Sequence, residues 1–192
     1  MNVITVAISI TIPPKEDAMP RNYKSIKKTA LKNVSEFMCT AARTAPKTRG
    51  KDNLVISLLS EADKKKVVTQ MKKISKRDNR PSCGRDANNL KNVDDIMIIA
   101  TKKAVLGLDC GFCGYASCKD LAKTKGVCAY NSMDLGIALG SAVSVASAFH
   151  VDNRLMFSIG KAVIELNLLG KGIVQAIGIP LSVTGKNPFF DR

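Results

Sequence analysis

Four cysteines lie within nineteen positions of this 192-residue chain, and they constrain its fold more than any other feature. Cys110, Cys113, Cys118 and Cys128 follow the pattern C-x2-C-x4-C-x9-C. Thiols this close in sequence are expected to be close in space, and the x2 spacing lets one tight turn direct two sulfurs at a single metal centre. Gly111 and Gly114 bracket the Phe112-Cys113 pair, which gives the backbone freedom to wrap and leaves amide N–H groups to face sulfur.

Three interpretations of this cysteine segment are open. A 4Fe–4S cluster needs four thiolates around a compact cubane, usually with one ligand more distant than the rest, and the spacing fits. Structural zinc usually shows two C-x2-C pairs, whereas the second pair here is separated by nine residues. Free thiols are the third interpretation, because disulfides are not expected in a chain without an export signal. The spacing favours the cluster.

Charge divides the chain into two unlike halves. Residues 1–103 carry 22 Lys or Arg against 10 Asp or Glu, whereas residues 104–192 carry 8 against 6. A basic half suggests an anionic partner (nucleic acid, a phosphate-bearing cofactor or an acidic protein) or else a solvated lysine-rich surface. The alternative function is therefore a nucleic-acid-binding protein with a structural metal site. The scarcity of aromatics among the lysines and the absence of a known motif argue against nucleic acid.

The composition is that of a soluble globular protein, with 45% apolar and 24% charged residues. Disorder, collagen and coiled coil are excluded. The longest uncharged apolar stretch, residues 135–149, is shorter than the roughly 20 residues that a membrane span needs. Apolar residues 1–12 have no basic n-region and alternate as a strand does, so they do not resemble a secretory signal. We expect a cytoplasmic protein that does not enter a membrane.

Apolar spacing predicts an α+β fold. Helices are expected at residues 21–42, 61–75, 131–149 and 155–169, the last capped by Asp152 or Asn153. Strands are expected at residues 54–59, 95–100 and 173–179, with Pro180 closing the last, and residues 78–92 read as a loop. Residues 1–18 form an N-terminal extension with a strand. Helices and strands alternate only loosely, so residues 19–192 are expected to form a single domain with a mixed sheet packed by helices. The cysteine segment, residues 107–128, is an inserted loop.

A cation-rich turn after the first helix is a candidate anion site. Arg43, Lys47 and Arg49 lie there with no acid among them, and clustered cations with free backbone N–H groups can hold a phosphate. The structural alternative is a solvated turn.

Three single residues have weaker functional interpretations. Cys83 lies near Arg80 and Arg85, whose charges would lower a thiol pKa, so it is either reactive, a substitute ligand for Cys128, or an ordinary free thiol. Cys39 is expected to be a small buried hydrophobe. His150, the only histidine, is expected at a helix end, where its charge would favour the helix dipole rather than catalyse a reaction.

The residues also resemble a known family. The run CGFCGYASCKDLA, followed by Gly126 and Cys128, resembles the small iron–sulfur domain of corrinoid and carbon-monoxide metabolic proteins. The wider chain resembles uncharacterised prokaryotic proteins that contain a ferredoxin domain. The matching stretches are AARTAPKTRG at 41–50, the cysteine segment, DLGIALGSAVS at 134–144, VDNRLMFSIG at 151–160 and GIPLSVTGKNPFFDR at 178–192.

A second resemblance, of fold outline, is to the flavin-dependent nitroreductases. It implies FMN, with its phosphate near Arg43, Lys47 and Arg49, and it implies a homodimer. On these expectations the chain is a 4Fe–4S redox protein that transfers electrons to and from an unknown redox partner. With a flavin it would be an oxidoreductase whose cluster is the electron port. A cluster that only stabilises the fold or senses oxygen is also open.

Overall fold

A four-stranded antiparallel sheet organises the computed structural model, which describes residues 20–190. The strands are β1 (Leu54–Leu58), β2 (Asp95–Lys102), β3 (Asp152–Asn153) and β4 (Ile173–Ser182), in the order β1-β2-β4-β3. All three pairings are antiparallel. The predicted α+β class is confirmed, although the sheet is antiparallel where a mixed one was expected. The predicted strand within residues 1–18 lies outside the described residues.

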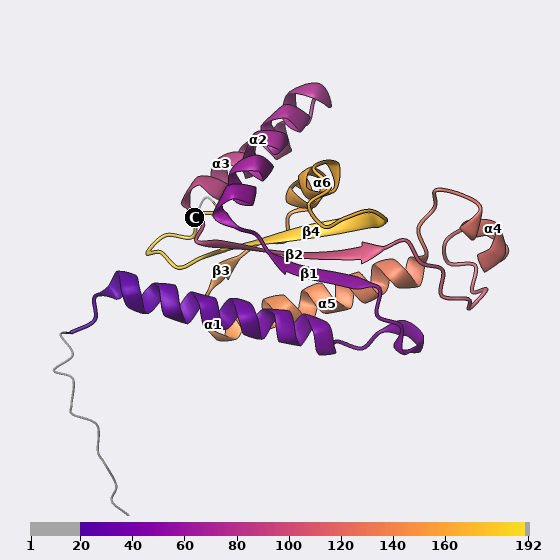
Figure 1. Ribbon diagram of the computed structural model, residues 1–192, viewed down its shortest axis with the longest axis horizontal. Coiled ribbons are helices and arrows are strands. Elements are labelled where there is room, and N and C mark those ends of the chain that lie inside the picture. The colour runs from indigo at the N-terminus through magenta and orange to yellow at the C-terminus, as the bar shows by residue number, and fades with distance from the viewer. Residues whose placement is uncertain (1–19, 191–192) are drawn as a thin grey trace, which may run out of the picture.

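Helices cover both faces of the sheet (Figure 1). The long helices α1 (Tyr23–Thr44) and α5 (Ala129–Ala148) pack on one face. The other face is covered by α2 (Glu61–Arg77), α3 (Pro81–Asn89) and α6 (Phe157–Glu165). Short 3-10 turns, η1 (Thr48–Gly50) and η2 (Leu90–Asn92), follow α1 and α3. In the described part of the chain, no helix is long and apolar enough to span a membrane.

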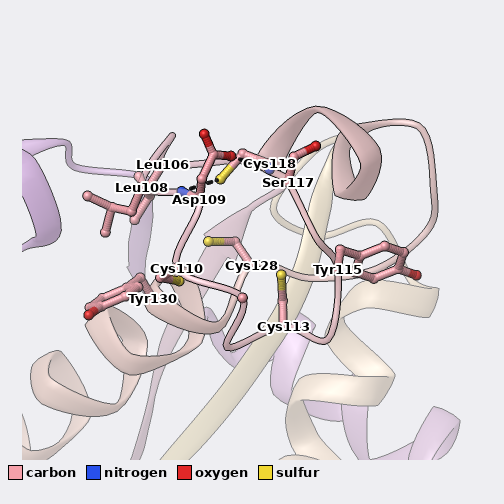
Figure 2. A pocket seen from close by; sticks show the side chains of 11 residues that line it. Leu106, Leu108, Asp109, Cys110, Cys113, Tyr115, Ser117, Cys118, Cys128 and Tyr130 are labelled. Atoms are coloured by element: carbon pink, nitrogen blue, oxygen red, sulfur yellow. Dashed lines mark hydrogen bonds between the residues drawn. The ribbon is translucent and has the colours of Figure 1, made fainter.

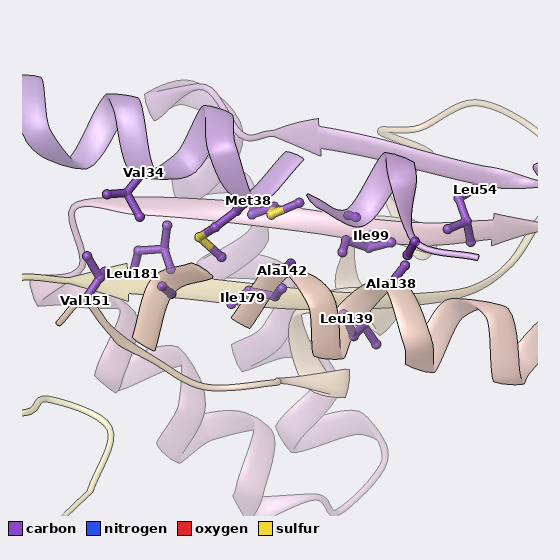
Figure 3. Packing of buried hydrophobic residues seen from close by; sticks show 14 of the residues in the cluster. Val34, Met38, Leu54, Ile99, Ala138, Leu139, Ala142, Val151, Ile179 and Leu181 are labelled. Atoms are coloured by element: carbon purple, nitrogen blue, oxygen red, sulfur yellow. The ribbon is translucent and has the colours of Figure 1, made fainter. Parts of the chain in front are cut away.

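Strand β2 is the centre of both cores, because its side chains alternate between the two helical layers. Met97 and Ile99 pack with α1 and α5, as Figure 3 shows for Ile99 beside Ala138 of α5. Ile98 packs on the opposite face with α2, α3 and α6. This burial on both faces explains why the sequence of β2 is an unbroken apolar run rather than an alternating one.

The ends of the elements follow capping and turn chemistry. The Asn22 side chain accepts a hydrogen bond from the Ser25 N–H (3.0 Å) at the start of α1, and the Ser60 hydroxyl accepts one from the Asp63 N–H (3.1 Å) at the start of α2. Such caps satisfy helix N–H groups that have no partner within the helix. The C-terminal carbonyls of α1 receive hydrogen bonds from the Lys47 ammonium.

Three predicted boundaries were wrong. The polar stretch 78–92 contains helix α3 rather than only a loop, because Pro81 starts a helix whose buried face is made by Cys83 and Ala87. Strand β4 continues past Pro180 to Ser182. The Leu181 carbonyl accepts a hydrogen bond from the Asp94 N–H, so the polar backbone groups of Leu181 face the β2 side. Because these groups alternate along a strand, the nitrogen of Pro180 faces the opposite, β3 side. There the β3 ladder begins only at Leu181, so no N–H is needed at Pro180.

The last helix also differs from the prediction. Asp152 and Asn153 form strand β3 instead of a cap, and α6 begins later, at Phe157, without a side-chain cap. Helix α6 packs against β4 through Gly160, which has no side chain to separate the two backbones. A Cβ atom at Gly160 would lie 1.6 Å from the Ala176 carbonyl oxygen.

Candidate metal centre

The segment between β2 and α5 forms a separate lobe, residues 103–128, which we call the cysteine lobe. It extends beyond the end of the sheet (Figure 1) and contains one short helix, α4 (Cys118–Ala122). Its small core consists of Leu106, Leu121 and Cys128, with Tyr115 and Tyr130 packed against them. The lobe therefore has its own apolar cluster, distinct from the two cores on the sheet.

All four cysteines of the spacing motif line one pocket in this lobe. Figure 2 shows Cys110, Cys113, Cys118 and Cys128 around it, together with Leu106, Leu108 and two tyrosines. Cys128 reaches the pocket because it is the residue that directly precedes α5, and Cys118 because it opens α4. The nine-residue gap before Cys128 is thus bridged by α4 and the turn that follows it.

A tight glycine turn places the first two cysteines. The Gly114 N–H donates to the Gly111 carbonyl (2.9 Å), which folds the backbone around Cys113. Both glycines have positive φ, 74° and 80°, a conformation that residues with a Cβ adopt at a cost. Nothing lies within 4 Å of a Cβ added at either glycine, so the turn requires their backbone freedom and not their small size.

Asp109 ties the turn to α4. Its amide N–H donates to the Cys118 sulfur (3.3 Å), and its carboxylate accepts from the Cys118 N–H (2.6 Å), as Figure 2 shows. Asp109 itself has a positive φ of 46°. An amide N–H directed at a cysteine sulfur is the kind of contact that stabilises a thiolate ligand and tunes a metal cluster. Sequence reasoning missed Asp109, although its place immediately before Cys110 was a usable signal.

The two other cysteines lie away from this pocket. Cys83 is fully buried between α3 and its neighbours, and burial raises the pKa of its thiol; the nearby Asp86 carboxylate acts in the same direction. The expectation of a reactive loop thiol with a lowered pKa was therefore wrong, because burial outweighs the nearby cations. Cys39 lies half-buried on α1, and burial raises its pKa too. His150 lies exposed just after α5.

Within residues 20–190, no three His, Cys, Asp or Glu side chains form a group that could hold a metal ion as the side chains stand. The four cysteines line one small pocket without gathering closely enough to hold a single ion.

The cation-rich turn is bound to the chain's own oxygens. Arg43 forms an ion pair with Asp52, and Lys47 donates to three carbonyls at the end of α1. Arg49 Nη1 donates to the carbonyls of Leu106 (3.1 Å) and Gly107 (3.2 Å), at the entrance of the cysteine lobe. The turn is thus connected to the cysteine lobe, a link that the sequence did not indicate. Whether the three cations also hold a phosphate stays a prediction.

A buried carboxylate fixes this turn. Asp134 on α5 accepts hydrogen bonds from the Thr48 N–H (3.0 Å) and the Thr48 hydroxyl (2.8 Å). Its neighbour Asn131 donates to the Lys102 carbonyl (2.9 Å) and accepts from the Thr101 hydroxyl (2.9 Å). Both were missed from sequence, although Asp134 is the only charged residue in the otherwise uncharged stretch 126–149. The two side chains anchor α5 to the segments on either side of the lobe entrance.

Sequence comparison places the chain among known relatives. A protein described as uncharacterised, from Archaeoglobus fulgidus, is 34% identical over 180 residues, which cover 89% of this chain and 96% of that protein. The family described as "Uncharacterized protein containing a ferredoxin domain" matches residues 124–192, a range that includes Cys128. The family resemblance inferred from the sequence is confirmed.

Solved structures of similar fold include nitroreductases and oxidoreductases, some of them described as FMN-dependent or FMN-containing. The FMN-dependent nitroreductase NfnB from Mycobacterium smegmatis, in complex with NADPH, matches with a TM-score of 0.56 and 8% identity over 80% of this chain and 78% of that chain. Nitroreductase A from Vibrio parahaemolyticus matches with a TM-score of 0.55 and 13% identity, over 82% and 60%. NADPH:FMN oxidoreductase from Vibrio harveyi gives 0.55 and 10%, over 83% and 63%. At such identities the likeness establishes the fold alone, and it confirms the nitroreductase-like outline.

Proposed function

Because the chain belongs to the family of uncharacterised proteins that contain a ferredoxin domain, we propose that it is a redox protein carrying one 4Fe–4S cluster. The ligands would be Cys110, Cys113, Cys118 and Cys128. The observation that carries the proposal is that these four cysteines, and neither Cys39 nor Cys83, line one pocket. A cubane takes one thiolate at each of its four irons, so its ligands surround a volume rather than a point.

The residues around the pocket fit such a cluster. Its four soft thiols are the ligand set that iron–sulfur clusters take. The Asp109 N–H already points at the Cys118 sulfur, and Leu106 is buried beside Cys128 in the lobe core. When bound, the cluster would supply one-electron transfer. The chain's own part is to hold the four sulfurs, to donate amide hydrogen bonds to them and to limit the access of water.

A flavin-linked oxidoreductase is the second candidate, and the nitroreductase-like fold favours it. The three cations of the predicted phosphate site differ in whether they are free to bind an anion. Lys47 already donates to three carbonyl oxygens, which occupies its ammonium protons. Arg43 and Arg49 each use only Nη1 for contacts among residues 20–190, which leaves Nε and Nη2 available to an anion. The two arginines are therefore the better part of the predicted site.

Single cysteine replacements test the cluster proposal. Cys110→Ser, Cys113→Ser, Cys118→Ser and Cys128→Ser are each expected to lose most of the iron and acid-labile sulfide measured in protein purified without oxygen. The matched controls Cys39→Ala and Cys83→Ala remove a thiol elsewhere and are expected to keep both. A Cys128→Ser protein with full iron, together with a Cys83→Ala protein without it, would contradict the ligand assignment. Zinc without sulfide in the parent protein would contradict the redox proposal and favour the structural-metal alternative.

A further inference from the structure

The cysteine lobe exposes apolar side chains immediately beside the four cysteines. Phe112, between Cys110 and Cys113 in sequence, is 67% exposed, and Leu108 is 41% exposed. The Phe112 ring is held in place by stacking on Tyr130, with 5.9 Å between ring centroids and an interplanar angle of 13°. An exposed aromatic side chain held in one position is typical of the central contact of a protein interface. Its position on the turn that carries two of the cysteines links that contact to the metal pocket.

The charge on the lobe has one predominant sign. Residues 103–128 contain four lysines and two aspartates. Asp120 accepts from Ser117 and pairs with Lys123 (3.2 Å), whereas Asp109 accepts from the Cys118 N–H and keeps its negative charge, so the lobe has a small positive excess. Lys119 and Lys125 are exposed and have no ion pair or hydrogen bond with any residue among 20–190. The Arg49 guanidinium lies against the entrance of the lobe and adds to its positive charge.

We propose that this surface, Phe112 and Leu108 together with Lys119 and Lys125, is the docking site of an acidic electron-carrier protein. The inference rests on the proposed redox function and adds the partner's chemistry. Encounters between redox proteins are small, below about 1,200 Å² of buried area, and are guided by opposite charge. The same lobe offers one exposed apolar contact and two cations without a partner among residues 20–190, which meets both requirements. A carrier seated on Phe112 lies next to the turn that holds Cys110 and Cys113.

An acidic carrier fits this surface better than nucleic acid does. Binding to single-stranded nucleic acid uses several aromatic platforms along a basic groove, whereas Phe112 is the one aromatic side chain of the lobe exposed by more than a third. Helix α2, which carries many lysines, lies away from the lobe (Figure 1). Charge changes on α2 therefore serve as a control for the effect of net charge without a change in the lobe.

The test measures how the cluster-loaded protein binds two probes, an acidic flavodoxin and an acidic ferredoxin. Binding is followed by NMR titration at low and at high salt. The double variant Lys119→Glu/Lys125→Glu is expected to raise the dissociation constant by about tenfold or more at low salt and to flatten its salt dependence. Phe112→Ser is expected to weaken binding at both salt concentrations. The control Lys72→Glu/Lys73→Glu makes the same change in net charge on exposed residues of α2 and is expected to alter binding by less than about twofold.

Equal losses in the two double variants would overturn the proposal, because only total charge would then matter. Absence of binding to both carriers would also overturn it, as would binding that Phe112→Ser leaves unchanged. If the lobe variants weaken binding of a single-stranded DNA oligonucleotide but not of the carriers, the surface is a nucleic-acid site instead. Iron and sulfide content is measured on every sample. A parent protein without a cluster contradicts the proposed function, whereas a loaded protein without lobe-dependent binding contradicts only the docking site.

Discussion

Replacing Gly160 by alanine should destabilise the protein severely, although alanine is the better helix former. Gly160 lies inside α6, where alanine would ordinarily stabilise by about 1 kcal/mol. Here the new Cβ would lie 1.6 Å from the Ala176 carbonyl oxygen and 2.3 Å from the Ala176 carbonyl carbon. Both atoms belong to the backbone of β4, which cannot rotate away as a side chain can.

The magnitude follows from what must move. An ordinary contact needs at least 3.4 Å, so α6 and β4 would have to separate by almost 2 Å, which would disturb the buried side chains of Ile159 and Val163. Overpacking that flexible side chains can absorb costs about 1–3 kcal/mol. Because the clash is with backbone, we expect a loss of at least about 3 kcal/mol in the free energy of unfolding.

The assay is urea denaturation followed by circular dichroism, with Gly136→Ala as the matched control. Gly136 lies in α5, and nothing is within 4 Å of a Cβ added there, so this variant should equal the parent or gain up to about 1 kcal/mol. A Gly160→Ala protein within about 1 kcal/mol of the parent would refute the packing of α6 on β4 described above.

Two further predictions concern electrostatics and the lobe entrance. Hydrogen bonds from Arg77 lower the pKa of both Glu165 and Asp78 to about 2, so these carboxylates stabilise the fold fully above their ordinary values near about 4 and lose that contribution as pH falls towards 2. The urea concentration at the unfolding midpoint should therefore decrease as the pH is lowered from 5 to about 2.5, and this decrease should be smaller in Arg77→Ala. An Arg77→Ala protein with the same pH profile as the parent would contradict this assignment. Arg49→Ala should release iron to a chelator several-fold faster than Arg43→Ala does, because only Arg49 binds the lobe carbonyls, and equal release rates would contradict that role.

The cysteine spacing correctly predicted which cysteines lie together, whereas the polarity of residues 78–92 wrongly predicted a loop. Cys110, Cys113, Cys118 and Cys128 could be grouped from the sequence, because short intervals leave a chain few ways to separate them. Cys83 was assigned to a loop because the residues around it are mostly polar, although they form a helix with one buried face. The available signal for that helix was Ala87, an apolar residue four positions after Cys83.

Long-range partners were beyond the reach of sequence reasoning. Three cations in a turn resemble an anion site, yet Lys47 satisfies the end of its own helix and Arg49 reaches carbonyls that are 57 and 58 residues away. Backbone carbonyls carry no sequence signature, so such contacts appear only when the chain is folded. The buried carboxylate of Asp134, which accepts from Thr48 across 86 positions, is a further case.

The central claim is that the four cysteines of the lobe carry a redox-active 4Fe–4S cluster. It is tested most directly by iron and acid-labile sulfide content, with a visible spectrum before and after dithionite, on protein purified without oxygen. The account predicts about four irons and four sulfides per chain and a brown chromophore that dithionite bleaches. Zinc without sulfide, or no metal at all, would contradict it.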